Sequence, residues 1–533
     1  MNLFSIELLL SYSALILIFF SITGLGNYLN INFFKIQIDN FYENFVIGIS
    51  FVIFYLQIHI IFLPINLINS LVIILLLILG FLYSIKKIIK KLDFKFLISV
   101  TLCFLIIINS NVYPYWNTLY DYGFYHNTYL NWLNQENIVV GLANLHFRFG
   151  YTGSSYLLGA FFNFYPYYGN GYIFTSSIFF VFLIFLFINK IDLKKDTFLN
   201  IFNIFILYVI IKYILVETLS DVSPDKIASC LLIFLIYCLI KNSYLKKSNN
   251  YQLCFITLSI LVTLGPLTWF IVILFLTVLI YENYIDLKNK YKFLFYLFCF
   301  CAIYALLNFL KSGNIFYPII FPIIDTFFTV YSNEALYHSQ NFPKGYPTGT
   351  EWVLPTLKIT ILSNKFVILY LISLISLIFL TLSRYKLYLF QNKIILKLNL
   401  ILILAIIFWF VNAPVIRYAK IYFWLGFIII FSFYFKNFIK IKFYPILYFC
   451  IFLYCGISSI NNLAIKRSDI SKYEAQVLNP LKEKITIHNN QKIYINSFNY
   501  TEEKFHIMHD VFEGKENDLV FNKNFFPIFH FHK

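Results

Sequence analysis

Strongly apolar runs of about 15 to 20 residues recur along the first 460 residues of this chain. An α-helix needs about 20 mainly apolar residues to cross a bilayer, and these runs are too numerous to be the buried helices of one soluble core. The composition agrees, because 60% of the 533 residues are hydrophobic and only 12% are charged. The sequence therefore predicts a polytopic membrane protein and excludes both a soluble cytosolic enzyme and a disordered chain.

The fold class that follows is an all-α integral membrane protein with about 13–14 transmembrane helices, outward-facing interfacial helices and a small α/β soluble tail. The first apolar run has no basic region before it and no cleavage pattern of small residues, so we expect it to be retained as a span. The expected spans lie near residues 3–27, 44–63, 70–85, 95–110, 171–188, 197–217, 227–240, 252–266, 267–281, 293–310, 366–383, 394–411, 421–435 and 443–460.

Short basic clusters between alternate spans predict the orientation of the chain. The net charge of +16 comes mainly from cations that flank apolar segments, so it indicates topology and not a nucleic-acid partner. Six clusters, from Lys86–Lys95 to Lys436–Lys442, hold 21 cations in about 49 residues, whereas the four intervening loops hold 8 in about 133. The positive-inside rule therefore assigns the clusters to the cytoplasm. The loops that then face outward are 111–170, 218–226, 311–365 and 412–420.

Two parts of the chain depart from the pattern of spans. Residues 1–460 form the predicted transmembrane domain, with its large outward loops at 111–170 and 311–365, whereas residues 461–533 alternate polar stretches with strand-like pieces such as Lys492–Ile495. This tail is expected to be a small extracytoplasmic domain. The apolar stretch Tyr151–Phe164 is expected to be an interfacial or re-entrant helix, because a further span would reverse every later basic cluster. All eight cysteines lie in expected spans, so no disulfide or zinc site is predicted.

The first outward loop concentrates ionisable and aromatic residues. Asp121 precedes an expected helix at 124–135, which contains His126 and on which Tyr125, Tyr129 and Trp132 would share one side. The aromatic side chains would most simply anchor that helix in the membrane interface, and Asp121 is either its cap or a catalytic acid. Further along the same loop stand two candidate substrate-binding residues, His146 and Arg148.

Three shorter outward segments add candidate substrate-binding residues. Asp221 and Asp225 stand in a short turn where Asp225 would cap the next helix after Pro224, or where both acids would contact a metal or sugar hydroxyls. Arg417 lies on the face that the positive-inside rule depletes of cations, so it suits an anionic headgroup or pyrophosphate, or else reaches lipid phosphate. The remaining candidates are Lys311 and Tyr317 in the second long loop, and Tyr418 and Lys420 in the last.

Two resemblances to known proteins rest on these segments. The first motifs are Asp121-Tyr-Gly-Phe-Tyr-His126, Gly141-Leu-Ala-Asn-Leu-His146 with Arg148-Phe-Gly150, Ser223-Pro-Asp225, Ser312-Gly313 with Tyr317-Pro318, and Ala413-Pro414 with Arg417. Over residues 110–425 they resemble an uncharacterised family of bacterial polytopic membrane proteins. In layout, an acid-bearing outward loop and a late A-P-x-x-R-Y loop resemble the GT-C class of membrane glycosyltransferases, which use polyprenyl-phosphate-linked sugars.

The GT-C resemblance implies a function and roles for the residues. Asp121 would act as general base on the acceptor hydroxyl, with His126, or else Asp221 and Asp225, supplying the second catalytic function. Arg417 would meet the charge on the departing lipid phosphate. The expected partners are membrane lipids, a polyprenyl-phosphate-linked sugar and a glycan or lipid acceptor, at the outer face of a bacterial cytoplasmic membrane. The sequence requires no cofactor, and whether a divalent metal takes part stays open.

Two alternative functions remain. An O-antigen-polymerase or ligase-like protein would use His146, Arg148, His338 and Arg417 on pyrophosphate-linked glycans. A lipid-glycan transporter without covalent chemistry would need internal repeats and ionisable residues in mid-span, for which only Lys212 and His59 are candidates. His59 is most simply a hydrogen-bonded residue of helix packing.

Overall fold

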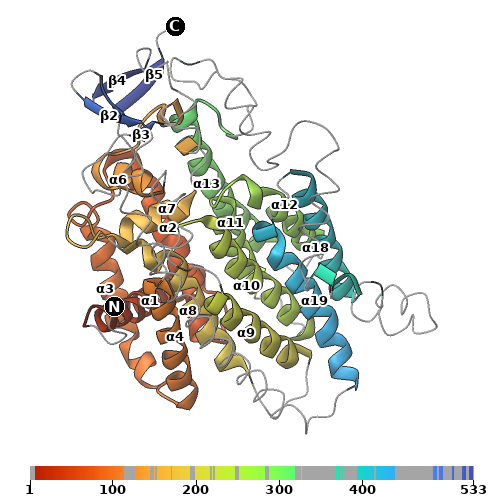
Figure 1. The fold of residues 1–533 in the computed structure, drawn as a ribbon. Helices are drawn as coiled ribbons and strands as arrows, with labels where there is room; N and C mark the ends of the chain where they lie inside the picture. The colour runs from red at the N-terminus through yellow and green to blue at the C-terminus, as the bar shows by residue number, and fades with distance from the viewer. Residues whose placement is uncertain are drawn as a thin grey trace.

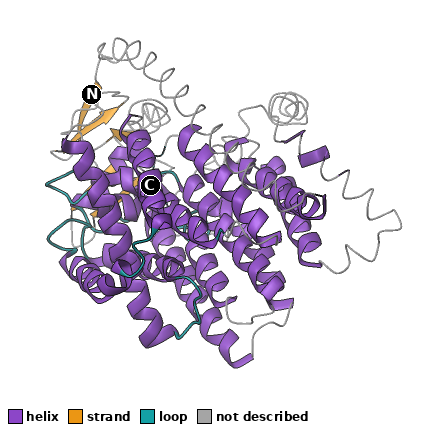
Figure 2. Ribbon diagram, turned by 90° about the horizontal axis from the view of Figure 1, so that it is seen from below, coloured by secondary structure: helices purple, strands orange, loops and turns teal. Residues whose placement is uncertain are grey.

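The structure is a computed structural model of the whole chain. Most of the described elements are helices, which pack side by side as a bundle (Figures 1 and 2). The residues that it describes are 6–112, 126–144, 149–150, 153–169, 171–191, 198–216, 219, 222–245, 251–281, 287–317, 326, 367–368, 370–372, 375, 393–412 and 416–438, together with the five strands of the tail.

Twelve of the fourteen expected spans coincide with helices, and the other two fall mostly or wholly outside the described residues. The helices are α1 (Ile6–Leu29), α2 (Asn44–Phe62), α3 (Leu71–Ile89), α4 (Phe94–Val112), α8 (Phe174–Lys190), α9 (Phe198–Val216), α10 (Pro224–Leu245), α11 (Tyr251–Val262), α12 (Pro266–Tyr281), α13 (Leu287–Ser312), α18 (Lys393–Asn412) and α19 (Ile416–Phe438). Two shorter α-helices are α6 (Asn127–Gln135) and α7 (Ser154–Phe162), and short 3-10 or π turns are η1 (Asn30–Phe34), η2 (Phe41–Glu43), η4 (Leu142–Asn144) and η6 (Gly171–Ile173).

The protein is an all-α membrane protein. Among the described residues, five helical segments are long and apolar enough to cross a bilayer, and six further apolar helices are shorter. The α8 segment is buried along its whole length, so α8 is the central helix, whereas α3 and α13 turn many apolar side chains outward, as lipid-facing helices do.

Glycines bring α1, α2 and α3 into close contact. A Cβ at Gly24 of α1 would overlap the carbonyl oxygen of Gly80 on α3, and a Cβ at Gly26 would overlap that of Asn44 on α2. Small residues at such crossings allow two backbones to approach in a membrane, where van der Waals packing supplies much of the attraction between helices. The first three spans therefore form one tightly packed unit.

The helix ends fall into two groups at opposite ends of the bundle. At one end, Lys95 donates to the carbonyl oxygen of Ile191 at 2.7 Å and Lys241 donates to Glu43 at 2.9 Å. At the other end, main-chain hydrogen bonds join Ile65 to Leu133, Ile138 to Ile60, Gly141 to Leu310 and Ser154 to Thr263. The first group contains residues of the predicted cytoplasmic clusters and the second contains residues of the predicted outward loops, as the alternation of charges requires.

The tail contributes strands beside the second end. β1 (Lys484–His488), β2 (Gln491–Ile495) and β3 (Ile507–Met508) form one sheet, and β4 (Leu519–Lys523) and β5 (Pro527–Phe531) form another. β1 pairs antiparallel with β2, and β2 pairs parallel with β3. β5 contacts η4, so the described strands lie at the end of the bundle that carries α6 (Figure 1). The boundary of the tail at residue 461 stays a prediction.

Three details of the sequence prediction were wrong. Tyr129 and Trp132 are 3% and 1% exposed, so they pack inside the protein instead of anchoring α6 in the interface. α10 begins at Pro224, which places Asp225 inside its first turn and not before it. α19 begins at Ile416, so Arg417, Tyr418 and Lys420 belong to a helix start and not to a nine-residue loop. α19 begins before its apolar segment, because long basic side chains can reach water from the first turns of a helix.

Candidate functional site

A network of buried amides fixes α6 and α7 at the predicted outward end. The Asn134 amide nitrogen donates to the carbonyl oxygens of Ile65 and Ala160 at 2.6 and 2.9 Å. Asn163 donates to Asn134 at 3.1 Å and accepts from the main chain of Tyr172 at 3.0 Å. Every residue of α7 is buried and its nine residues are too short to span a bilayer, which favours the re-entrant alternative for the stretch after Tyr151.

His126, a predicted catalytic residue, lies within this assembly. Its side chain is 4% exposed, and its Nδ1 is 2.6 Å from the Tyr156 hydroxyl in a hydrogen bond between α6 and α7. Tyr156 packs edge to face on Tyr129, and the Lys311 ammonium lies 6.0 Å from the centre of the Tyr129 ring. A continuous series of contacts therefore connects two sequence-predicted residues, His126 and Lys311.

Tyr317, a predicted substrate-binding residue, packs against the same group. It is 1% exposed, and a Cβ at Gly150 would press on its ring. Gly150 follows Phe149, whose ring stacks on Tyr129 at 5.4 Å between centroids. We name the five residues His126, Tyr129, Tyr156, Lys311 and Tyr317 the outward cluster.

A small pocket opens beside Lys311. Its polar lining comes from Gln57 of α2, Tyr129 of α6, Ser154 of α7, and Tyr304 and Lys311 of α13. Lys311 is 3% exposed, and Gln57 is fully buried with no hydrogen-bond partner for either amide atom among the described residues. An unmade hydrogen bond to a buried amide costs free energy, so this pocket suits a polar guest.

A second group of predicted residues gathers where α9, α10 and α19 meet. Lys212 and Lys420 lie 5.3 and 5.8 Å from the centre of the Trp424 ring, and Trp424 is 2% exposed. Asp225 is half-buried in the first turn of α10, where a negative charge favours the helix dipole. α10 contacts α19. Lys420 and Asp225 therefore belong to neighbouring helix starts.

Several predicted residues cannot be located in this arrangement. Asp121, His146, Arg148, Asp221 and His338 lie outside the described residues, and the side chains of Arg417 and Tyr418 do too. Among the residues that the structure describes, no group of three His, Cys, Asp or Glu side chains is placed to hold a metal ion. None of the six cysteines among the described residues forms a disulfide.

Comparison with known proteins identifies a family. The model of a domain of unknown function, DUF8201, matches residues 8–424. The chain belongs to the DUF8201 family. No curated protein and no solved structure matches it significantly. The matched range contains the whole outward cluster and both lysines at Trp424, so these residues lie within the domain that defines the DUF8201 family.

The sequence analysis missed several residues of the DUF8201 domain. Gln57 and Ser154 line the pocket and Tyr156 contacts His126, but the sequence analysis singled out none of the three. Gln57 could have been found from the sequence, because a primary amide inside an apolar span is energetically unfavourable and is therefore a candidate functional residue. Tyr156 and Ser154 had no such signal, since their partners are distant in sequence. His59 is as predicted, since its Nε2 is 3.3 Å from the carbonyl oxygen of Pro64.

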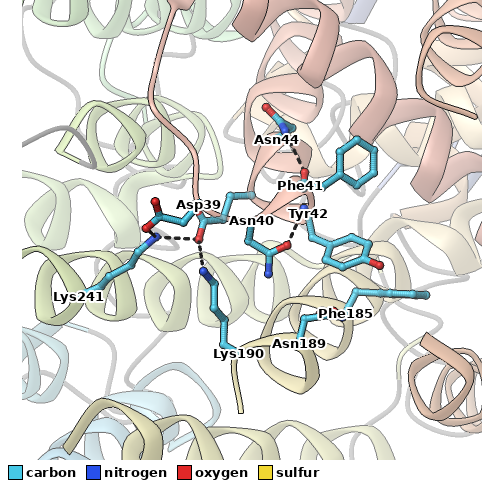
Figure 3. Close-up of polar contacts among 10 residues, drawn as sticks. Asp39, Asn40, Phe41, Tyr42, Asn44, Phe185, Asn189, Lys190 and Lys241 are labelled. Carbon is cyan, nitrogen blue, oxygen red and sulfur yellow. Dashed lines mark hydrogen bonds and ion pairs between the residues drawn. The ribbon is translucent and has the colours of Figure 1, made fainter. Parts of the chain in front are cut away.

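An ion-pair cluster at the opposite end was also missed. Lys241 lies 2.9 Å from Oε1 of Glu43 and 3.1 Å from Oδ2 of Asp39, and Lys190 lies 3.7 Å from the same Glu43 oxygen (Figure 3). The Glu43 side chain is fully buried and that of Lys241 is 3% exposed, whereas Asp39 and Lys190 are partly exposed. The two acids and two lysines join α8 and α10 to the start of α2.

Proposed function

We propose that this DUF8201 protein is a membrane glycosyltransferase. It moves a sugar from a polyprenyl-phosphate donor to a glycan or lipid acceptor at the outer face of a bacterial cytoplasmic membrane. The observation that carries the proposal is the meeting of His126, Lys311 and Tyr317 in one buried group at one end of the bundle. All three were candidates from sequence alone, and they come from two segments far apart in the chain, one with His126 and one with Lys311 and Tyr317.

The chemistry of the outward cluster suits group transfer from a phosphate. A histidine whose Nδ1 is held by Tyr156 has a fixed ring, and fixed orientation is what a proton-transfer group needs. Lys311 supplies a cation in a buried setting, where its attraction to a developing anionic charge is stronger than in water. Tyr156 is a positioning residue in this scheme, because it would act through His126.

The proposed reaction forms one bond and breaks one. The acceptor oxygen bonds to the anomeric carbon of the sugar while the bond from that carbon to the phosphate oxygen breaks. The acceptor proton passes to a base, Asp121 or His126, and the electron pair of the broken bond leaves on the lipid phosphate. Arg417 and Lys311 are proposed to stabilise that phosphate, and Arg417 lies in the first turn of α19.

The experiment follows label from donor to product. Membranes that contain the wild type or Asp121→Asn are supplied with radiolabelled polyprenyl-phosphate sugars, and loss of label from the lipid is measured. We expect transfer by the wild type and a loss of about a hundredfold or more in Asp121→Asn, the size of a general-base contribution.

A matched control is Asp93→Asn at the other end of the bundle. Asp93 accepts a hydrogen bond from the main chain of Phe96 at 2.8 Å, a capping role that asparagine fills equally well. Transfer should be unchanged in this variant. An intact lipid pool with every donor would contradict the proposal and favour the polymerase, ligase or transporter alternatives.

A further inference from the structure

The pocket between α2, α6, α7 and α13 has lining residues that indicate the chemistry of a ligand. We infer that it is an anion subsite that takes one phosphate oxygen, held by the Lys311 ammonium and the Gln57 amide. That the subsite binds an anion is inferred from the geometry of the pocket alone. That the phosphate is carried by a polyprenyl lipid rests on the proposed function.

The charge of the lining favours an anion. Among the described residues that line the pocket, Lys311 is the charged one, and no aspartate or glutamate is among them. The other polar lining groups are neutral: Gln57, Ser154 and two tyrosines. The Lys311 side chain is 3% exposed beside these neutral groups, and a buried lysine ammonium binds an anionic oxygen with a charge-assisted hydrogen bond.

Gln57 points to a guest independently of Lys311. Its amide nitrogen and oxygen are both buried without a hydrogen-bond partner among the described residues, on a helix whose other side chains are mainly apolar. A buried amide left in that state is unfavourable for folding. The amide nitrogen can donate to an anionic oxygen, and the amide oxygen can accept from a protonated phosphate or a water that accompanies it.

The size of the pocket limits the guest to a single oxygen. The space between the lining side chains is about that of one water molecule. A sugar ring cannot enter, whereas one non-bridging oxygen of a phosphate can. The backbone helps to fix this size, since a Cβ at Gly153 would overlap the carbonyl oxygen of Leu264 and push α7 away from α11.

The position of the pocket favours a lipid as the source of the phosphate. Lys311 lies in the last turn of α13, a helix that exposes Phe295, Phe298 and Leu306 on its surface. A lipid chain along such a helix would bring its phosphate to the level of the helix end. A free phosphate ion has the same oxygen chemistry, so the experiment separates the two sources.

The test measures binding without catalysis, so it can fail independently of the glycosyltransferase assay. The purified full-length chain in detergent is titrated with farnesyl phosphate, inorganic phosphate or farnesol, and the thermal unfolding midpoint is followed. We expect farnesyl phosphate to raise the midpoint and farnesol to leave it unchanged. Lys311→Met should weaken farnesyl phosphate at least about tenfold, the loss expected for a charge-assisted hydrogen bond.

Two further variants make the result specific. Gln57→Glu keeps the side-chain shape but puts a negative charge in the pocket, so it should weaken binding at least as much as Lys311→Met. Lys292→Met removes an exposed lysine near the other end of α13, which donates to the carbonyl oxygen of Phe33, and should bind like the wild type.

Each outcome decides the inference. Lys311-dependent binding of farnesyl phosphate supports a lipid phosphate, and Lys311-dependent binding of inorganic phosphate alone supports the same subsite with a free ion as its guest. Equal affinities in the wild type, Lys311→Met and Gln57→Glu would overturn the inference, as would stabilisation by farnesol equal to that by farnesyl phosphate.

Discussion

Glu43 and Lys241 are oppositely charged side chains with almost no contact with solvent. Their burial has a cost, because removing each charge from water is unfavourable, and the 2.9 Å pair offsets that cost only while both partners are present. Asp39 and Lys190 add further ion pairs on the side of the cluster that water reaches. At the scale of residues, this cluster stabilises the structure at one end, and the outward cluster is proposed to carry the chemistry at the other.

Removing the charge of Glu43 alone is therefore expected to destabilise the protein more than removing the charges of both Glu43 and Lys241. Glu43→Gln leaves Lys241 with Asp39 alone, at an expected cost of about 3 kcal/mol, the lower end for a broken buried pair. Glu43→Leu combined with Lys241→Met removes both buried charges and should recover part of that stability. Unfolding in mixed micelles measures all three proteins, and a double variant less stable than Glu43→Gln would contradict this account.

The positions of helices could be predicted from sequence, whereas the contacts between them could not. Apolar runs and flanking lysines located α2, α8 and α13 within a few residues, because crossing a bilayer dictates length and polarity locally. The burial of α6 and α7 depends on Asn134 and Asn163, whose partners lie on other helices. Tyr156 likewise matters through its contact with His126, which lies 30 residues away in the sequence.

At the scale of elements, the crossing of α1 and α3 depends on Gly80. A Cβ at Gly80 would lie 2.5 Å from the main-chain nitrogen of Leu25, so Gly80→Leu must separate the two helices. We expect a cost of about 1–3 kcal/mol, typical of overpacking. Leu79→Ala on the neighbouring, lipid-facing position, where the side chain is 60% exposed, serves as the control. Comparable unfolding midpoints for Gly80→Leu and the control would refute the close crossing.

The whole molecule has two different ends. Lysines of α8 and α10 pair with the acidic start of α2 at one end, where Lys91 after α3 also lies over the Tyr42 ring. At the other end, α6, α7 and the end of α13 enclose His126 and Lys311. The described strands of the tail lie at that second end (Figure 1). If the basic end is cytoplasmic, as the positive-inside rule predicts, His126 and Lys311 lie at the outer face of the membrane, where the proposed substrates would bind.

The most direct measurement of the central claim is sugar transfer by His126→Asn in reconstituted vesicles. Asparagine keeps a polar atom near Tyr156 but cannot exchange a proton near neutral pH, so transfer should fall about a hundredfold or more. His59→Gln is the matched control, since the His59 ring at the same end stacks on Tyr55 and its Nε2 lies 3.3 Å from the Pro64 carbonyl oxygen, a polar contact that glutamine can also make. Loss of transfer in His126→Asn alone is the result we predict; equal rates in the wild type and both variants would contradict a catalytic role for the outward cluster.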